Sequence, residues 1–137
     1  VPIGAYHYFS ACRDGLSQAE HFLDLVPEPG DLPAVLDVEG DTRCNRGTRL
    51  TGLEDEVMRW LDRVEEERGT RPLLYSNRAF HDLWLGGIEA DRWLASYSRQ
   101  PGDGWVFWQY TSAGRVPGIA GPVDRNVYAG DALTLER

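Results

Sequence analysis

The chain has 137 residues, the size of one ordinary domain, and 42% of them are hydrophobic. Twenty-two acidic residues against fourteen basic ones give a formal net charge of −8, which argues against non-specific binding to nucleic acid or to an anionic membrane surface. Fifteen aromatic residues supply ample core material and argue against disorder. No apolar stretch approaches the length of a membrane span, and these 137 residues contain no signal-peptide pattern.

The chain opens with a predicted strand followed by a predicted helix. Residues 1–9 alternate, so His7 shares a face with Ile3, Ala5 and Phe9, while the neighbouring tyrosines face the other way. Ser17 with Glu20 three residues later has the pattern of a capping box and predicts the start of a helix. Prolines and a glycine at 27–30 end it.

Two carboxylates end the next strand, predicted over residues 32–39. Asp37 and Glu39 share one face because side chains alternate along a strand, and Leu36 and Val38 share the other. Partial burial and like charge would raise at least one pKa and separate the pair into an acid and a base. Glycosidic bond cleavage needs such a pair. The alternative is a solvated strand end with two surface acids.

A polar loop over 40–49 leads to a second helix, for which Thr51 and Glu54 form a capping box and Gly69 the C-cap. Residues 72–76 predict a short strand. Asn77 then caps a third helix, whose inward side chains are Phe80, Leu83 and Trp84.

Three further strands are predicted over 92–97, 105–110 and 123–128, with a loop rich in glycine and proline over 114–122. Strands and helices alternate in the first half of the chain, and strands follow one another in the second half. The order is typical of a parallel α/β sheet.

Polar and aromatic side chains recur near the carboxyl ends of these strands. Besides Asp37 and Glu39, they are His7, Tyr75, Tyr97, Gln109, Asp124 and Asn126. Each has an ordinary structural interpretation, such as a hydrogen-bonded core histidine, a core tyrosine or an Asx turn. Because carboxyl ends of parallel strands meet in one crevice, their recurrence predicts a shared site.

The two cysteines, Cys12 and Cys44, lie in the loops that follow two successive predicted strands. Neighbouring loops could bring them together in a disulfide, which would imply an oxidising compartment. The alternative is two unpaired thiols. Their spacing does not suggest a metal site.

Six segments of the sequence resemble family 25 glycoside hydrolases, the lysozymes (N-acetylmuramidases) of bacteria, phages and fungi. In order, they are GAYHYF at 4–9, LDVE at 36–39, LYSN at 74–77, WLASY at 93–97, WQYTS at 108–112 and VDRN at 123–126. The D-x-E pattern alone is also found in chitinase-like enzymes, but there further spaced aspartates precede it. Here Pro33, Ala34 and Val35 stand at those positions.

The resemblance implies an α/β fold, an irregular TIM-like (β/α) barrel with few helices in its second half. The chain begins at what looks like the third strand, so residues 1–137 are expected to form a single catalytic-type domain comprising strands three to eight of an amino-terminally truncated barrel. The first strand of the family carries an aspartate of the site, which would then be absent. A barrel lacking two strands exposes two edges, through which self-association is expected.

The resemblance also implies cleavage of the β-1,4 bond between N-acetylmuramic acid and N-acetylglucosamine, with no cofactor or metal. Glu39 would be the general acid and base, Asp37 would assist attack by the substrate N-acetyl group, and Asp124 would help to hold Asp37. The remaining side chains would bind the glycan: His7, Tyr75, Tyr97, Gln109 and Asn126.

Two other functions fit the sequence. One is a non-catalytic wall-binding module or inactive lysozyme fragment that keeps the aromatic groove. The other is a metal-dependent hydrolase using His7, Asp37 and Glu39, although these residues have no recognisable ligand spacing. The expected partners are peptidoglycan glycan strands, with neither nucleic acid nor membrane. The expected location is outside the cell, either secreted or wall-associated, or in a phage endolysin.

Overall fold

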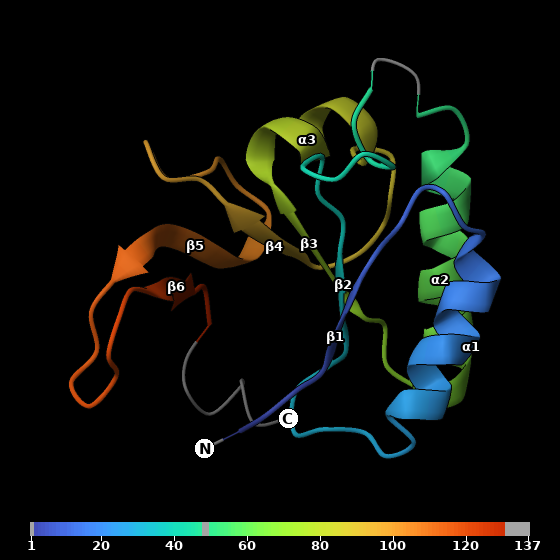
Figure 1. Ribbon diagram of the computed structural model, residues 1–137, viewed down its shortest axis with the longest axis horizontal. Helices are drawn as coiled ribbons and strands as arrows, with labels where there is room; N and C mark the ends of the chain where they lie inside the picture. The colour runs from blue at the N-terminus through green and yellow to red at the C-terminus, as the bar shows by residue number, and fades with distance from the viewer. Residues whose placement is uncertain (1, 48–49, 131–137) are drawn as a thin grey trace.

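The computed structural model describes residues 2–47 and 50–130. Within them lies one six-stranded sheet in the order β1-β2-β3-β4-β5-β6 (Figure 1). The elements in chain order are β1 (Tyr6–Tyr8), α1 (Gly15–Leu25), β2 (Val35–Asp37), α2 (Leu53–Arg68), β3 (Leu73–Asn77), α3 (Arg78–Trp84), β4 (Arg92–Ala95), β5 (Trp105–Gly114) and β6 (Val123–Tyr128). Val1 of the first predicted strand and residues 48–49 of the predicted loop lie outside the described residues.

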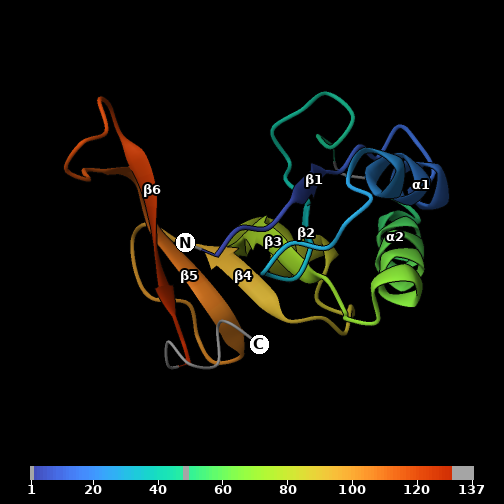
Figure 2. The same ribbon diagram turned by 90° about the horizontal axis from the view of Figure 1, so that it is seen from below.

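Strands β1 to β5 pair in parallel, as the alternation of strands and helices predicts, but β6 runs antiparallel to β5. The all-parallel expectation is therefore wrong at this last pair. Residues 115–122 form no helix that could carry the chain back across the sheet, so β6 returns beside β5. In Figure 2, β5 and β6 turn away from the layer formed by α1 and α2.

The hydrophobic core lies between one face of the sheet and helices α1 and α2 (Figures 1 and 2). Leu36 and Val38 point into it and are fully buried, as the alternation of the D-x-E segment predicts. Trp60 of α2 is also fully buried and packs against Phe22 of α1 at 5.2 Å between ring centroids. The opposite face of the sheet is thereby left to the side chains of the candidate site.

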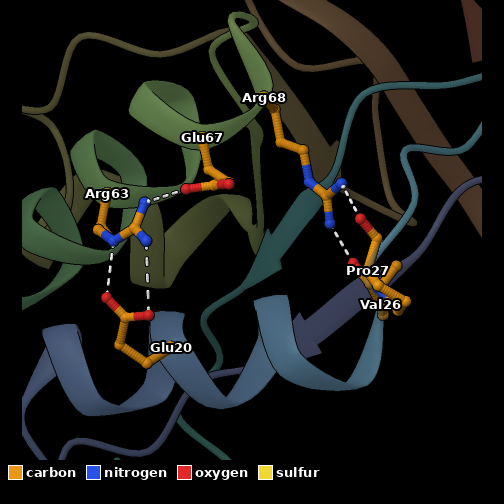
Figure 3. Close-up of polar contacts among 6 residues, drawn as sticks. All are labelled: Glu20, Val26, Pro27, Arg63, Glu67 and Arg68. Atoms are coloured by element: carbon orange, nitrogen blue, oxygen red, sulfur yellow. Dashed lines mark hydrogen bonds and ion pairs between the residues drawn. The ribbon is translucent and has the colours of Figure 1, made fainter.

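Polar contacts also join the two helices and the chain that follows α1 (Figure 3). Arg63 of α2 bonds to Glu20 of α1 at 2.7 Å and to Glu67 within its own helix at 2.9 Å. Arg68 donates to the backbone carbonyls of Val26 and Pro27. Exposed ion pairs of this kind contribute little stability individually, so packing of the core carries most of the helix–helix interaction.

Two predicted helix starts are wrong. Helix α1 begins at Gly15 with Asp14 as N-cap, and Ser17 donates its N–H to the Asp14 carboxylate at 2.8 Å. The Gly15 N–H also bonds to Glu56 of α2 at 2.6 Å, a tertiary contact that extends the helix beyond its local signal. Helix α2 has Gly52 as N-cap without a side-chain cap, so Thr51 plays no capping role.

The other predicted caps are confirmed. Gly69 ends α2 with φ of 68°, and Asn77 accepts the Phe80 N–H at 2.9 Å at the start of α3. Leu83, predicted to face inward on α3, is 75% exposed instead, while Phe80 is buried. A helix of two turns buries only a narrow stripe, and Leu83 falls outside it.

The predicted disulfide between Cys12 and Cys44 is confirmed. It joins the loop after β1 to the loop after β2. Asn45 reinforces the same junction, because its side chain donates to the Phe9 carbonyl and accepts the Ala11 N–H, each at 2.8 Å. The two loops that follow β1 and β2 are therefore fixed relative to each other.

Candidate active site

A cleft of about 350 Å³ lies on the sheet face opposite helices α1 and α2. Strands β1 to β6, or the residues directly after them, all contribute to its lining. The lining residues are Tyr6, Val35, Asp37, Glu39, Tyr75, Trp93, Gln109, Asp124 and Asn126. The structure thus brings together six of the eight site residues predicted from the sequence.

The D-x-E segment is held rigidly by its neighbours. The Phe9 N–H donates to the Asp37 carbonyl at 2.8 Å, and the Val38 N–H donates to the Tyr75 carbonyl at 2.9 Å. The buried Ser76 hydroxyl donates to the Val38 carbonyl at 2.7 Å. Backbone contacts on both sides therefore fix the directions of the two carboxyl groups, as a preorganised site requires.

The glycine after Glu39 has a steric cause. A Cβ atom at Gly40 would lie 2.7 Å from the Phe80 ring of α3, closer than a side chain tolerates. The chain therefore turns tightly against α3 directly after Glu39, and this close approach fixes where Glu39 leaves the sheet.

Burial and mutual repulsion perturb both carboxyl groups. Burial, followed by the charges of Glu39 and Asp41 and a hydrogen bond to Glu39, raises the pKa of Asp37 to about 7. Burial and the charge of Asp41 raise the pKa of Glu39, with a further contribution from Asp124, against the opposing effect of the hydrogen bond from Asp37. The pair therefore shares a proton near neutral pH, as acid–base chemistry requires.

One oxygen of this pair is left without a partner. Among the described residues, none forms a hydrogen bond with Asp37 Oδ1, although that atom is buried. A buried unpaired acceptor costs free energy and is favoured where a substrate donor completes it. The position suits a bound N–H or O–H group.

Strand β6 supplies the far side of the cleft. Asp124 and Asn126 share a face of this strand, as alternation predicts, and both line the cleft. The Asn126 side-chain oxygen accepts the Trp93 indole N–H at 2.8 Å, which joins β6 to β4 across β5. This contact fixes the position of β6 against the rest of the site.

The aromatic residues divide between the cleft and its rim. Tyr75 lies in the cleft, and burial, then the charges of Glu39 and its neighbours, raises the pKa of its hydroxyl. Tyr97 is 58% exposed and outside the lining, but its hydroxyl accepts the Gln109 side-chain N–H at 2.8 Å. Tyr97 therefore lies beside the cleft and orients one of its lining amides.

His7 does not lie in the cleft. Its ring stacks on Trp60 at 5.8 Å and bonds to Gln18 at 3.2 Å, on the helical side of the sheet. Because His7 pairs with Leu36 in the parallel register, it faces the core, and burial lowers its pKa. The metal-hydrolase alternative needs His7 beside Asp37 and Glu39, so the structure does not support it.

Three residues that line the cleft, Tyr6, Val35 and Trp93, are missing from the sequence-based site. Alternation within single strands could have found Val35, which shares the face of Asp37, and Trp93, whereas Tyr6 depends on the register between β1 and β2. Tyr6 pairs with Val35 and so shares the face of Asp37, while Trp93 shares a face with Tyr97 by strand alternation. Trp93 packs edge-on against Tyr75 at 5.7 Å.

Within the described residues, no group of three or more histidine, cysteine, aspartate or glutamate side chains is arranged to hold a metal ion. None of the helices described here is both long and apolar enough to cross a bilayer. Two interacting carboxyl groups beside aromatic faces can transfer a proton to and from a bound polar polymer such as a glycan.

Comparison with known proteins finds relatives by sequence and by structure along nearly the whole chain. The uncharacterized protein YegX of Escherichia coli (strain K12) is 41% identical over 140 residues, which cover 97% of this chain and 50% of YegX. Lysozyme M1 of Streptomyces globisporus is 31% identical over 153 residues, covering 96% of this chain and 51% of that protein. A solved family 25 glycosyl hydrolase from Bacillus anthracis superposes with a TM-score of 0.82 at 28% identity, covering 97% of this chain and 66% of the other.

The fold has the barrel-type α/β architecture that the sequence predicts and is that of the family 25 glycosyl hydrolases. The family model for glycosyl hydrolases family 25 matches residues 1–119. The chain belongs to this family. It spans about half the length of the two relatives named above.

Proposed function

We propose that this chain carries the catalytic centre of a peptidoglycan hydrolase that cleaves the β-1,4 bond between N-acetylmuramic acid and N-acetylglucosamine. The observation that carries the proposal is that the carboxyl groups of Asp37 and Glu39 line the same cleft, where burial raises the pKa of both. Membership of family 25 and similarity to Lysozyme M1 support it. In this proposal residues 1–137 act as one catalytic-type domain.

In the proposed reaction, Glu39 donates its proton to the glycosidic oxygen as the bond to the anomeric carbon breaks. The carbonyl oxygen of the substrate acetamido group attacks that carbon and forms a cyclic oxazolinium intermediate. Asp37 Oδ1, which lacks a partner among the described residues, accepts the acetamido N–H and stabilises the positive charge. Glu39 then removes a proton from water, which opens the intermediate and completes hydrolysis.

The proton must lie on Glu39 when the bond breaks. In the free cleft, burial and neighbouring negative charge raise the pKa of both groups, so either can hold the proton. A bound acetamido N–H favours ionised Asp37, which transfers the shared proton to Glu39. Substrate binding would therefore place the proton on Glu39, the general acid.

The other residues of the cleft have supporting roles in this proposal. Asp124 helps to hold Asp37 and shape the sugar site from β6. Tyr75 and Tyr97 offer aromatic faces to sugar rings, while Gln109 and Asn126 bind amide and hydroxyl groups. Buried amide donors and acceptors select partners that match them.

A second function, wall-glycan binding without turnover, has its own supporting observation. Within the described residues the sheet is open at β1 and β6, and aromatic side chains line its uncovered face around Trp93 and Phe107. Such a surface could hold a glycan strand without cleaving it. Under either function the partner is peptidoglycan, the site of action is outside the cell, and self-association through the two open edges remains a proposal.

The experiment is release of reducing ends from purified peptidoglycan, with the products identified by mass spectrometry. We expect reducing ends on muramic acid from the parent protein and none from Glu39→Gln, with glycan binding retained. Glu66→Gln, an exposed residue of α2, makes the same chemical change away from the cleft and should behave as the parent. Binding without release by the parent would select the second function, and unchanged release by Glu39→Gln would remove Glu39 as the acid.

A further inference from the structure

A third carboxylate is held beside the catalytic pair by a tyrosine from a different strand. The Tyr8 hydroxyl of β1 donates a hydrogen bond to the Asp41 carboxylate, 33 residues away along the chain. Asp41 follows Glu39 by two residues, beyond the turn at Gly40. Neither Tyr8 nor Asp41 lines the cleft, and the proposed reaction does not use them.

The direction of Tyr8 follows from the register of the sheet. Tyr8 pairs with Asp37 across the parallel β1–β2 ladder, so its side chain lies on the face of Asp37 and away from the core. Tyr8 is therefore directed to the end of β2 where Asp41 lies, and burial, followed by the hydrogen bond and charge of Asp41, raises the pKa of its hydroxyl.

The loop that carries Asp41 is fastened to β1 by contacts other than this hydrogen bond. The Cys12–Cys44 disulfide and the side chain of Asn45 both tie residues 40–47 to the chain just after β1. Asp41 is thus kept on the same side of the sheet as the catalytic pair, and Tyr8 fixes the direction of its carboxylate.

We propose that Tyr8 and Asp41 form a positioning pair that holds a negative charge against Asp37 and Glu39 and so keeps their shared proton in the cleft at neutral pH. Titratable groups that face Glu39 come from several elements: Tyr8, Asp37, Asp41, Tyr75 and Asp124. Asp41 is the charge that contributes most to the raised pKa of Glu39, after burial itself, and it also raises the pKa of Asp37.

The inference rests on the proposed function for its consequence in catalysis, but its physical core can be measured without turnover. Carboxyl ¹³C NMR titration of the parent protein reports the midpoints of Asp37 and Glu39 directly. In Asp41→Asn we expect both midpoints to move to lower pH. In Tyr8→Phe we expect a smaller shift in the same direction, because the freed Asp41 carboxylate can turn toward solvent.

Two variants control this titration. Asp41→Glu keeps the charge and should restore the midpoints toward those of the parent. Asp24→Asn removes one negative charge from an exposed position on α1 and should leave them unchanged. Since Asp41 is exposed, the shift in Asp41→Asn should also shrink at about 1 M salt. Unmoved midpoints in Asp41→Asn, or equal shifts in Asp24→Asn, would overturn the proposal.

In the activity assay, the alkaline limb of the kcat/KM profile should move to lower pH in Asp41→Asn. We expect a rate about two- to threefold below the parent at pH 7.5 and equal to it at pH 5, the size of effect that an exposed charge exerts. A uniform loss at all pH values would indicate a structural role and contradict the proposal. NMR shifts in a protein that releases no reducing ends would support the positioning pair and refute the muramidase function, so the two failures are distinguishable.

Discussion

Removing the Cys12–Cys44 bond should destabilise the protein by an amount that depends on the length of chain that the bond closes into a loop. The two cysteines are 32 residues apart in sequence, so the bond restricts a loop of that size in the unfolded chain. The chain-entropy relation gives about 3.7 kcal/mol at 25 °C for such a loop. This corresponds to a change of about 500-fold in the unfolding equilibrium constant.

The perturbation is the double substitution Cys12→Ser and Cys44→Ser, and the assay is urea denaturation followed by tryptophan fluorescence. The matched control is the parent protein treated with a reductant, which breaks the same bond without any substitution. Both should lose about 3.7 kcal/mol in the free energy of unfolding. The folded cleft should persist below the transition, because Asn45 still joins the two loops through the Phe9 carbonyl and the Ala11 N–H.

A loss under about 1 kcal/mol in both samples would refute the reasoning, since it would mean that the unfolded chain gains little freedom when the loop opens. A large loss in the double variant alone would instead indicate that the serine hydroxyls disturb the folded state. The urea dependence of unfolding should also steepen when the bond is broken, because an unlinked chain exposes more surface.

Asp37→Asn should raise the free energy of unfolding at pH 8 by about 1–2 kcal/mol and leave it unchanged at pH 3.5. The pKa of Asp37 is about 7 in the folded protein and 3.8 in the unfolded chain, so the free-energy cost of ionising the folded carboxyl group grows as the pH rises between these values. Equal effects at both pH values in urea titrations would contradict this. Tyr97→Ala should weaken glycan binding by about three- to tenfold in calorimetry, and an unchanged affinity would remove Tyr97 from the groove. Tyr97→Phe should show a smaller loss, because it keeps the aromatic face but lacks the hydroxyl that accepts the Gln109 N–H. Leu36→Ala should cost about 2–5 kcal/mol in thermal or urea unfolding, against under about 0.5 kcal/mol for the exposed Leu83→Ala, and similar losses would mean that Leu36 is not a core residue.

Much of the fold could be predicted because local signals and tertiary contacts agree along most of the chain. The apolar run before Asp37 is a buried strand, and Gly69 and Asn77 bound helices α2 and α3 as their residue types require. The start of α1 could not be predicted from local pattern alone. Ser17 has the sequence pattern of a cap, but Asp14 is the N-cap in the structure, and the contact of Gly15 with Glu56, 41 residues away, stabilises the earlier start.

The candidate site was predictable to the extent that it depends on alternation within single strands. Asp37 with Glu39, and Asp124 with Asn126, share faces for this reason and all line the cleft. Which face of β1 belongs to the site depends instead on register between strands, and a single strand does not reveal it. The sequence therefore predicts His7 as a site residue, whereas its pairing with Leu36 turns it toward the core.

The register of β1 against β2 determines which of its side chains face the core and which face the cleft. Turning His7 toward Trp60 fills the core beneath the sheet, and it necessarily turns Tyr6 and Tyr8 toward the opposite face. Tyr6 thereby reaches the cleft, and Tyr8 reaches Asp41 beside the catalytic pair. A one-residue slip of β1 would exchange these faces, bury two tyrosines and expose the histidine. Core packing on the helical side thus determines the electrostatic surroundings of the carboxyl pair on the other.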